Sequence, residues 1–288
     1  MSDRQIKENL HLVTVATHSE RYLPILSQQA KDKEINFIKL GIGKKYVGHF
    51  MKDLEMIDYL NSDKVQEDDI VIFADGFDTL LLAPHTEIIR KFKSYNCRLL
   101  LSIENVGSLD FIHKAVFQQV KGKFINTGLF MGYAGFLKRF LEEMYSRDFD
   151  KKSNQKTWAS FLESKKDYND IALDIHSKVF LNYSFTTTNY IKVKDKRVHM
   201  KGIKPCFIQG NGCEDLSKII KNTGYSDFDI HNKKRFLTVV QNNLKAVFFI
   251  YPIAAAYIFL AIVVFIFLTN FGYTYYRSKK DKYKYIYL

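Results

Sequence analysis

Cysteine is scarce in this sequence, and a hydrophobic leader is missing. Its 288 residues include three cysteines, Cys97, Cys206 and Cys213, and no two of them have the close spacing of a zinc knuckle or of a disulfide-rich secreted module. The first ten residues, MSDRQIKENL, contain two acids and no apolar run, so a secretory signal peptide is not predicted. Together these absences favour a reducing compartment.

The composition is that of a folded, basic protein. Hydrophobic residues make up 47% and aromatic residues 15% of the chain, which is enough for one sizeable core and argues against intrinsic disorder. Lysine and arginine total 43 against 31 acidic residues, a formal net charge of +12. Such an excess suits an anionic partner, for example a nucleotide, a nucleic acid or a membrane surface.

One long run without charge lies near the C-terminus. Residues 246–268 read AVFFIYPIAAAYIFLAIVVFIFL, and about 20 apolar residues span the core of a bilayer. The run predicts a transmembrane helix, because the alternative, a buried core helix of this length, usually has a polar face. Flanking basic residues are too balanced to fix its orientation, but without a signal peptide we expect a single-pass C-terminal anchor with the large N-terminal domain in the cytosol. The expected organisation is an N-terminal extension (1–9), one folded domain (10–225), a basic linker (226–245), the transmembrane helix (246–268) and a basic, tyrosine-rich tail (269–288).

The folded part alternates between two kinds of segment. Short apolar runs at 10–16, 35–40, 70–73 and 99–103 predict buried strands, and the stretches 21–33, 46–60 and 84–95 between them have the length and spacing of helices. This alternation predicts an α/β fold with a mostly parallel sheet and helices on both faces. Because such sheets bind ligands beyond the carboxyl ends of their strands, the residues that follow each strand are candidates for a site.

Polar residues follow several of these strands. Asp75 and Asp78 come directly after the third, and two carboxylates one turn apart can hold a divalent cation against phosphates; the alternative is an ordinary turn rich in Asp and Gly. After the first strand, Thr17 and Glu20 fit a capping box, which is compatible with ligand binding at a helix start. Glu104 follows the fourth strand. Four consecutive strand ends with polar or acidic groups favour a functional edge.

The second half of the folded part has three further signals. An acid-rich turn at 165–174 leads into a predicted helix that would put Asp170 and Asp174 on one face. A hairpin is expected around Asp195 and Lys196. A strand over 206–209 ends in Gly-Asn-Gly, a loop that lets a backbone approach a ligand closely or forms a plain turn.

The order of these segments resembles a known family. The stretches VTVAT, IVIFADGFDTLL, LLLSIE, FINTGLFMGYA, DYNDIALD and FIQGNG are similar, in sequence and spacing, to the glycosyltransferase domain of the lysyl hydroxylase and procollagen glycosyltransferase group, over roughly residues 10–225. The resemblance implies a GT-A type nucleotide-diphospho-sugar transferase fold, a UDP-sugar donor and Mn²⁺, or another divalent cation, held by an acidic motif. Nothing resembles the hydroxylase domain, so iron or 2-oxoglutarate chemistry is not expected.

The resemblance also implies roles for individual residues. The metal ligands are Asp75, Asp78 and Gln209. The donor-binding residues are Thr14, Ala16, Thr17, Lys45, Asp75, Asn126, Gly128, Gly210, Asn211 and Gly212. Glu104 belongs to the acceptor cleft, and Asn169 and Asp170 are the catalytic candidates beside the reacting carbon. For Lys45, in the lone motif GIGKK, the alternative is a solvated lysine.

Three positions depart from the family pattern. Gln209 stands where the family has a metal-binding histidine, and an amide oxygen holds Mn²⁺ less firmly than an imidazole. Ser108 falls near the place of a family tryptophan, and a polyaspartate run is reduced to Asp167, Asn169 and Asp170. These departures affect metal affinity and acceptor choice more than the fold.

The predicted function is a metal-dependent transfer of glucose or galactose from a UDP-sugar to a hydroxyl acceptor. The acceptor expected from the resemblance is hydroxylysine or galactosyl-hydroxylysine of a collagen-like chain; another glycan or a lipid-linked sugar is the alternative. A degenerate transferase that binds nucleotide sugars without turnover is a second hypothesis. A membrane-tethered nucleic-acid binder is the third, but the chain has no recognised basic-aromatic module, so a nucleic-acid partner is not expected.

Overall fold

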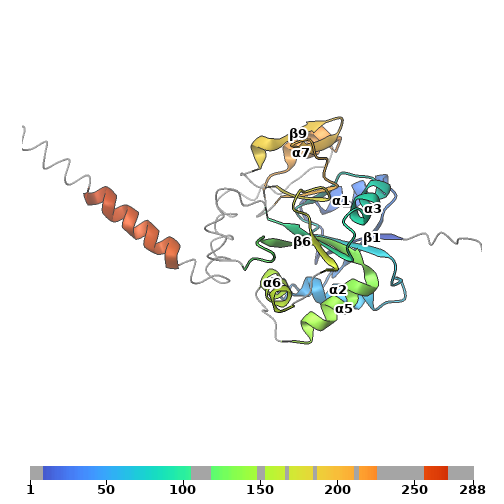
Figure 1. Cartoon of the computed structure of the whole chain (residues 1–288). Coiled ribbons are helices and arrows are strands. Elements are labelled where there is room, and N and C mark those ends of the chain that lie inside the picture. The colour runs from blue at the N-terminus through green and yellow to red at the C-terminus, as the bar shows by residue number, and fades with distance from the viewer. Residues whose placement is uncertain are drawn as a thin grey trace, which may run out of the picture. The chain divides into compact units, whose positions relative to one another are not determined.

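The computed structural model describes residues 9–104, 118–147, 153–165, 169–183, 187–210, 214–225 and 256–271. The chain divides into two compact units, Met1–Arg235 and Phe236–Leu288. The first unit contains the three sheets of the described residues (Figure 1). All the residues of the predicted site belong to it.

A six-stranded sheet forms the centre of the first unit, in the order β2-β1-β3-β6-β5-β7. Every neighbouring pair is parallel except the two made by β6, which runs antiparallel to β3 and to β5. The predicted α/β architecture with a mostly parallel sheet is therefore confirmed. The strands are β1 (Leu10–Val15), β2 (Asn36–Leu40), β3 (Ile70–Ala74), β5 (Leu99–Ile103), β6 (Ile125–Tyr133) and β7 (Ile171–Leu173).

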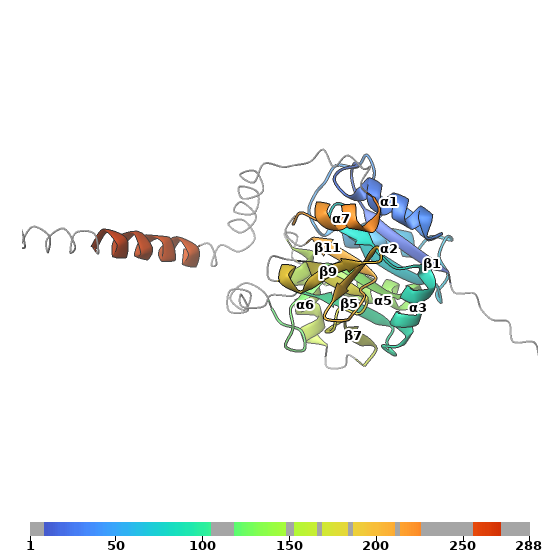
Figure 2. The same ribbon diagram turned by 90° about the horizontal axis from the view of Figure 1, so that it is seen from above.

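Helices cover both faces of this sheet. Along β3, Val71 and Phe73 pack into one hydrophobic cluster while Ile70 and Ile72 pack into the other, because successive side chains of a strand point to opposite faces. Strands buried on both sides read as continuous hydrophobic runs, which explains why they were recognisable in the sequence. One face is covered by α2 (Met51–Leu60), α5 (Ala134–Tyr145) and α6 (Asn154–Ser164), and the other by α1 (Leu23–Asp32) and α3 (His85–Lys93) (Figures 1 and 2).

A smaller layer carries the remaining strands. A three-stranded sheet has the order β4-β11-β8, and beside it β9 and β10 form the predicted hairpin. Its turn residues Asp195 and Lys196 have φ of 51° and 56°, the left-handed conformation that two-residue hairpin turns require. The elements are β4 (Thr79–Leu81), β8 (Phe180–Tyr183), β11 (Phe207–Gly210), β9 (Ile191–Lys194), β10 (Arg197–Met200), α7 (Ser217–Thr223) and a 3₁₀ turn at Thr188–Tyr190.

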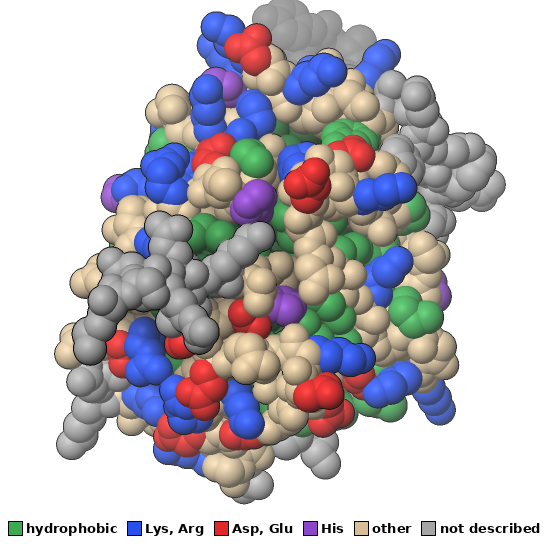
Figure 3. All heavy atoms as spheres, turned by 90° about the vertical axis from the view of Figure 1, so that its right-hand side faces the viewer, with side chains coloured by type: hydrophobic (Ala, Val, Ile, Leu, Met, Phe, Trp, Pro, Cys, Tyr) green, Lys and Arg blue, Asp and Glu red, His purple; other side chains and the backbone are tan. Residues whose placement is uncertain are grey.

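Charges are mixed on the part of the surface seen in Figure 3. Lysine and arginine side chains are interspersed there with aspartate and glutamate. On this face the basic excess of the chain does not form a patch of a single sign.

Two helices begin later than the sequence predicted. Arg21 has φ of 52°, which a right-handed helix cannot include, so α1 starts at Leu23 with a proline in its first turn and no side-chain cap. The capping box at Thr17 is thus wrong. Gly48 has φ of 138°, and α2 accordingly starts at Met51 instead of at residue 46.

The segment before Asp174 is a strand where a helix was expected. Ile171–Leu173 pairs in parallel with the first half of β5. Three apolar residues within an acidic stretch fit the period of a helix as well as that of a strand. Pairing with the free edge of β5, which is remote in sequence, makes this segment a strand.

The predicted transmembrane helix is a further correction. Residues 256–271 are helical, and no helix within the described part of the chain is long and apolar enough to cross a membrane. The expectation of a helix over 246–268, and with it a single-pass anchor, is therefore wrong; residues 246–255 lie outside the described residues. The hydropathy of the run shows only how apolar it is. A membrane span also needs about 20 residues of continuous helix, and the described helix covers residues 256–271.

Candidate functional site

Polar side chains gather where β1, β3 and β5 end. Asp75 directly follows β3 and Glu104 directly follows β5. Because β6 runs antiparallel to both, its first residues meet these ends: Asn126 pairs with Ser102 and Leu129 with Ala74. Four of the predicted site positions, Asp75, Glu104, Asn126 and Gly128, are thereby brought to one edge of the sheet.

Gln209 joins the two aspartates across the boundary between the sheets. It lies on β11 opposite Thr79, the first residue of β4, and it is 3% exposed. Its Nε2 donates to Asp75 Oδ2 at 3.4 Å and to Asp78 Oδ1 at 3.3 Å, while its Oε1 is buried without a hydrogen-bond partner among the described residues. The backbone completes the contact, since the Gly210 N–H donates to the Asp78 carbonyl at 2.7 Å.

Gly128 forms the wall behind this group. A Cβ at this position would lie 2.2 Å from Gln209 Nε2 and 2.8 Å from Asp75 Oδ2, so only glycine leaves room for both side chains. Its carbonyl accepts from the Asp75 N–H at 2.9 Å, and its own N–H donates to Asn126 Oδ1 at 2.7 Å. The pairing of β5 and β6 shifts register between Leu101 and Ser102, which leaves this stretch of β6 free to make these contacts.

Lys52 supplies a cation to the acid pair. It lies in the first turn of α2, and its Nζ is 2.5 Å from Asp75 Oδ1, with 17% of the lysine side chain exposed. Burial lowers the pKa of Lys52, but the charge and hydrogen bond of Asp75 outweigh it and the net shift is upward. Burial raises the pKa of Asp78 to about 7, and the charge of Asp75 acts in the same direction. A pair of carboxyl groups with one lysine still favours additional positive charge.

The loop between β2 and α2 borders the same place. Burial, and then the charge of Lys52, lower the pKa of His49, and the His49 and Tyr46 rings are 5.9 Å apart. Tyr46 and its neighbour Val47 are more than half exposed. Lys45, predicted to contact the donor, is an exposed residue of this loop.

An aromatic pair flanks the other side of the acid pair. The ring of Phe77, between the two aspartates in sequence, lies 5.2 Å from the ring of His18. His18 Nδ1 also contacts Thr17 Oγ1 at 3.0 Å, and its Nε2 contacts Glu20 Oε2 at 2.7 Å. The predicted donor residues after β1 are thus close to the Asp75–Asp78 turn.

Thr14 and Ala16 are buried behind that turn. They are 0% and 3% exposed, and a Cβ on Gly76 would lie 2.8 Å from Thr14 Oγ1. Thr14 Oγ1 has no hydrogen-bond partner among the residues described. Thr14 therefore shapes the Asp75–Asp78 turn from beneath.

Glu104 is held in place by Asn126. Asn126 Nδ2 donates to Glu104 Oε1 at 2.7 Å, so one amide connects the acid after β5 to the backbone of Gly128. Nearby, Asn182 Nδ2 donates to the Ile103 carbonyl at 2.6 Å, which ties the end of β5 to β8 in the second sheet.

Asn169 and Asp170 are not brought to this edge. The Asp170 carbonyl accepts from Arg98 N at 2.8 Å and from Leu99 N at 3.0 Å, at the start of β5. Glu104 lies at the other end of that strand, and four residue steps at about 3.3 Å separate the two ends by roughly 13 Å. Asp170 Oδ2 pairs instead with Arg98 Nη1 at 3.9 Å. The catalytic role of these two residues stays a prediction, and the register places them at the end of β5 opposite to Glu104.

Four positions named in the sequence analysis, two donor-binding residues and two that depart from the family pattern, lie outside the described residues. They are Ser108, Asp167, Asn211 and Gly212.

Sequence reasoning missed three residues near the site. Lys52 was assigned to the middle of a longer helix, whereas it lies in the first turn of α2. His49 precedes the start of this helix. Asn154, at the beginning of α6, has a buried Nδ2 without a partner in the described chain, and its Oδ1 accepts from Thr127 Oγ1 at 3.3 Å. A search for polar residues close to a glycine or proline that interrupts a helix would have found Lys52 and His49, which follow Gly48.

The residues present fit a hard divalent cation. Two carboxylates and the unpartnered Gln209 Oε1 are oxygen ligands of the kind that such cations take while keeping waters and bridging phosphates. Turning the Gln209 amide would bring that oxygen to the aspartates. Among the described residues no group of three or more His, Cys, Asp or Glu side chains is suited to a metal, so the amide would have to complete the set.

The chain matches known proteins along most of its first unit. The family model described as the PLOD GT domain, a glycosyltransferase domain, matches residues 6–225. Procollagen-lysine,2-oxoglutarate 5-dioxygenase 1 of Gallus gallus is 28% identical over 223 residues, which cover 72% of this chain and 30% of the relative. The multifunctional procollagen lysine hydroxylase and glycosyltransferase of Caenorhabditis elegans is 28% identical over 227 residues, covering 70% of this chain and 30% of the relative. This chain thus corresponds to less than a third of the length of these relatives.

Two solved structures are similar at low sequence identity. The galactosyltransferase LgtC, in complex with donor and acceptor sugar analogues, is 11% identical with a TM-score of 0.48, covering 76% of this chain and 97% of that one. A glycosyltransferase involved in glycosylation of the major capsid of PBCV-1 is 9% identical, also with a TM-score of 0.48, covering 75% of this chain and 98% of that one.

Proposed function

The chain belongs to the PLOD glycosyltransferase-domain family, and we propose that it transfers a hexose from a UDP-sugar to a hydroxyl acceptor with the help of a divalent cation. The observation that carries the proposal is the convergence of Asp75, Asp78 and Gln209. It lies at the carboxyl ends of the strands, where sheets of this kind bind ligands.

The donor diphosphate would bind at the acid pair. A divalent cation such as Mn²⁺, when bound, neutralises the charge that develops on a leaving diphosphate. Asp75, Asp78 and Gln209 Oε1 would hold it. Lys52, already beside Asp75, places a second positive charge within reach of the phosphates, and Gly128 leaves room for the Gln209 amide beside the Asp75 carboxylate.

The uridine would bind on the side of the acid pair where the aromatic rings lie. The rings of Phe77 and His18, whose centroids are 5.2 Å apart, offer flat surfaces, and Thr17 precedes His18 in the sequence. The buried Thr14 and Ala16 support the turn without reaching the base. The sugar would then extend toward Asn126 and the Gly128 backbone.

The acceptor would approach from the side of Glu104. With Asp170 at the opposite edge, Glu104 is the carboxylate in position to orient an acceptor hydroxyl or take its proton. Asn126 holds one of its oxygens in place. Relatives named for procollagen lysine favour hydroxylysine, or its galactosyl derivative, as the first acceptor to offer.

The test is UDP release from UDP-glucose and UDP-galactose, with Mn²⁺ and with EDTA, in the presence of a hydroxylysine-containing collagen peptide. We expect Asp75→Asn to lower turnover at least about 100-fold, the scale of losing a main electrostatic contribution to a transition state. Asp170→Asn is the matched control, the same substitution at the far edge of the sheet, and it should retain activity. Full turnover by Asp75→Asn would disprove the metal assignment, and loss of turnover by Asp170→Asn would disprove the placement of the reaction at this edge.

A second candidate function is nucleotide-sugar binding without catalysis. The Gln209 amide turns its nitrogen, and not its oxygen, toward both carboxylates, an arrangement that a cation must disrupt. Calorimetry would separate the two cases, because this candidate predicts tight UDP-sugar binding with no product at any metal concentration. Gln209→His, which offers an imidazole, would then create activity.

A further inference from the structure

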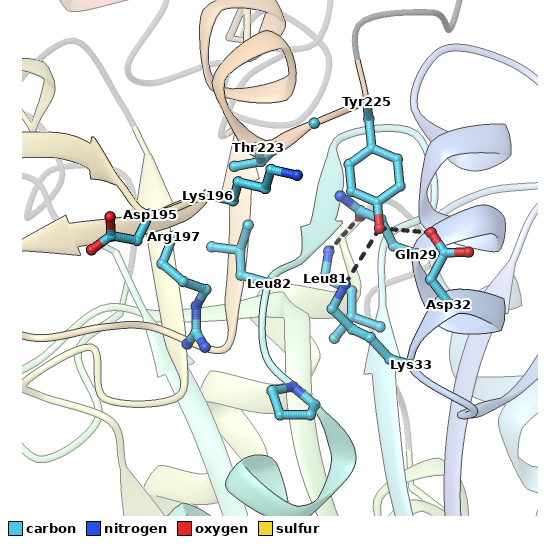
Figure 4. Close-up of a pocket in the computed structure, with 12 residues that line it drawn as sticks. Gln29, Asp32, Lys33, Leu81, Leu82, Asp195, Lys196, Arg197, Thr223 and Tyr225 are labelled. Carbon is cyan, nitrogen blue, oxygen red and sulfur yellow. Dashed lines mark hydrogen bonds between the residues drawn. The ribbon is translucent and has the colours of Figure 1, made fainter.

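A second cavity lies away from the acid pair, on the other side of β4. Its volume is about 460 Å³, within the usual range for small-molecule sites. Its walls come from α1, the end of β4, the β9–β10 turn and the end of α7 (Figure 4). The cavity lies at the free edge of β4, where the Leu81 N–H points to Gln29, whereas Gln209 lies on β11, the neighbouring strand on the other side of β4.

A buried donor without an acceptor faces this cavity. Gln29 is fully buried, and its Oε1 accepts from the Leu81 N–H at 2.8 Å. That contact fixes the amide, so Nε2 is turned the other way, and it has no hydrogen-bond partner in the described part of the chain. A buried N–H group left unpaired is unfavourable, and a ligand oxygen would satisfy it.

Two lysines reach the same space. Figure 4 shows Lys196 and Gln29 pointing toward one another from opposite walls. Lys196 runs along Gly224, where an added Cβ would lie 3.6 to 3.7 Å from the lysine side chain. Its ammonium makes no ion pair or hydrogen bond with any residue in the described ranges. From the other side Lys33 Nζ donates only a long hydrogen bond, 3.5 Å, to the Tyr225 hydroxyl.

The acids of the cavity are Asp32 and Asp195, and the charge of Asp32 offsets part of the charge of Lys33. Both carboxylate oxygens of Asp32 are occupied, by Tyr225 Oη at 2.9 Å and by Gln28 Nε2 at 2.7 Å. The fork of Arg197 is engaged by Glu87 at 2.9 and 3.1 Å. The donors that remain for a ligand are the two ammonium groups, the Gln29 amide N–H₂ and the buried Nε–H of Arg197, which has no hydrogen-bond partner among the described residues.

We propose that this cavity binds a phosphate monoester on a monosaccharide-sized molecule. Lysine binds phosphate as a point charge, and the terminal nitrogens of Arg197, which could hold a planar carboxylate in a fork, are already bonded to Glu87. Donors that approach from α1 and from the β9–β10 turn suit a tetrahedral oxyanion with oxygens on several sides. The proposal is independent of the sugar-transfer function and needs neither the metal nor the acid pair.

The test is calorimetric titration of the full chain in EDTA with glucose 6-phosphate and inorganic phosphate, and with glucose as the neutral comparison. Lys196→Asn should weaken binding at least about tenfold, which corresponds to losing one charge-assisted contact. Asparagine tolerates the left-handed conformation of residue 196, so the hairpin should be kept. Lys194→Gln is the matched control: it lies on the same hairpin, is exposed and does not line the cavity, and its affinity should stay within about twofold.

A second variant acts from the buried wall. Gln29→Glu keeps the acceptor for Leu81 and replaces the free donor by a carboxylate oxygen, so phosphate binding should be lost while urea denaturation shows a folded chain. Each of four results would overturn the proposal: no saturable binding below about 10 mM, equal binding of glucose, equal weakening by Lys194→Gln, or tighter binding of glucuronate than of glucose 6-phosphate. Displacement by UDP would also overturn it, because it would assign the phosphate to the donor site.

Discussion

Replacing Gly128 by alanine tests whether the Gln209 amide and the Asp75 carboxylate fill the space beside β6. The added Cβ would lie 2.2 Å from Gln209 Nε2, 2.6 Å from its Oε1 and 2.8 Å from Asp75 Oδ2, all inside van der Waals contact. Neither side chain can retreat, since Gln209 is 3% exposed and Asp75 is held by Lys52. Overpacking of this kind costs about 1–3 kcal/mol, and we expect Gly128→Ala to lower the free energy of unfolding by that order.

Urea denaturation can follow this loss through the single tryptophan. Trp158 is fully buried and its ring lies 4.8 Å from that of Phe130 on β6, so its fluorescence reports on the strand that carries Gly128. UDP release should fall together with stability, because the displaced carboxylate belongs to the proposed donor site. In the double variant Gly128→Ala/Gln209→Ala the two shortest contacts disappear, and part of the lost stability should return.

Gly122→Ala is the control for introducing a methyl group elsewhere. Gly122 has no atom within 4 Å of an added Cβ but has φ of 70°, so only the backbone strain of about 1–2 kcal/mol applies, with no loss of UDP release. If Gly128→Ala kept its stability within about 0.5 kcal/mol, the range of neutral surface changes, and kept full turnover, the packing described for the site would be refuted.

Three further changes test the surrounding framework. Burial raises the pKa of Asp53 to about 6, so the folded state binds the proton more tightly than the unfolded state. The free energy of unfolding should therefore fall by at most roughly 3 kcal/mol as the pH rises from about 4 to above 6. Urea denaturation at several pH values should show this pH dependence in the parent chain and not in Asp53→Asn. Burial raises the pKa of Glu87, but hydrogen bonds from Arg197 and Lys91 outweigh it and hold this pKa at about 2. The interaction therefore stabilises the fold above about pH 4.5, and its contribution is lost as the pH falls toward 2. In Glu87→Gln the free energy of unfolding should depend less on pH in that range. Asp174 accepts hydrogen bonds from three backbone N–H groups at 2.7 to 2.8 Å. Asp174→Asn turns an amide N–H₂ toward some of these groups and should lower the free energy of unfolding by about 2–4 kcal/mol. An unchanged midpoint in thermal or urea unfolding would contradict this.

The strands could be predicted because both faces of the main sheet are covered. The runs at β1, β3 and β5 are mostly hydrophobic, and such runs leave few alternatives once flanked by polar turns. The acidic turn after β3 was found in the same way, since Asp75 and Asp78 interrupt the most hydrophobic strand. Helix starts were less predictable, because the positive φ of Arg21 and Gly48 depends on the loops around them.

The site was only partly predictable because its partners meet through tertiary contacts. Lys52 is one of 43 basic residues, and only the delayed start of α2 sets it apart. The helix expected after the acidic turn was wrong for the opposite reason: the three-residue strand Ile171–Leu173 carries too little periodicity to outweigh the neighbouring acids, and its position is fixed by the edge of β5. The orientation of the Gln209 amide, with its nitrogen toward two carboxylates, depends on tertiary hydrogen bonds. A sequence motif does not predict it.

Lys52 is a counter-ion that dilution cannot remove. Its ammonium is covalently tethered 2.5 Å from Asp75, so a dissolved cation competes with a partner whose local concentration stays constant in every buffer. The carboxylate becomes available at low cost only when another anion receives the ammonium, and the phosphates of a nucleotide can do so. Cation and nucleotide would then bind with positive linkage, each raising the affinity for the other by the same factor.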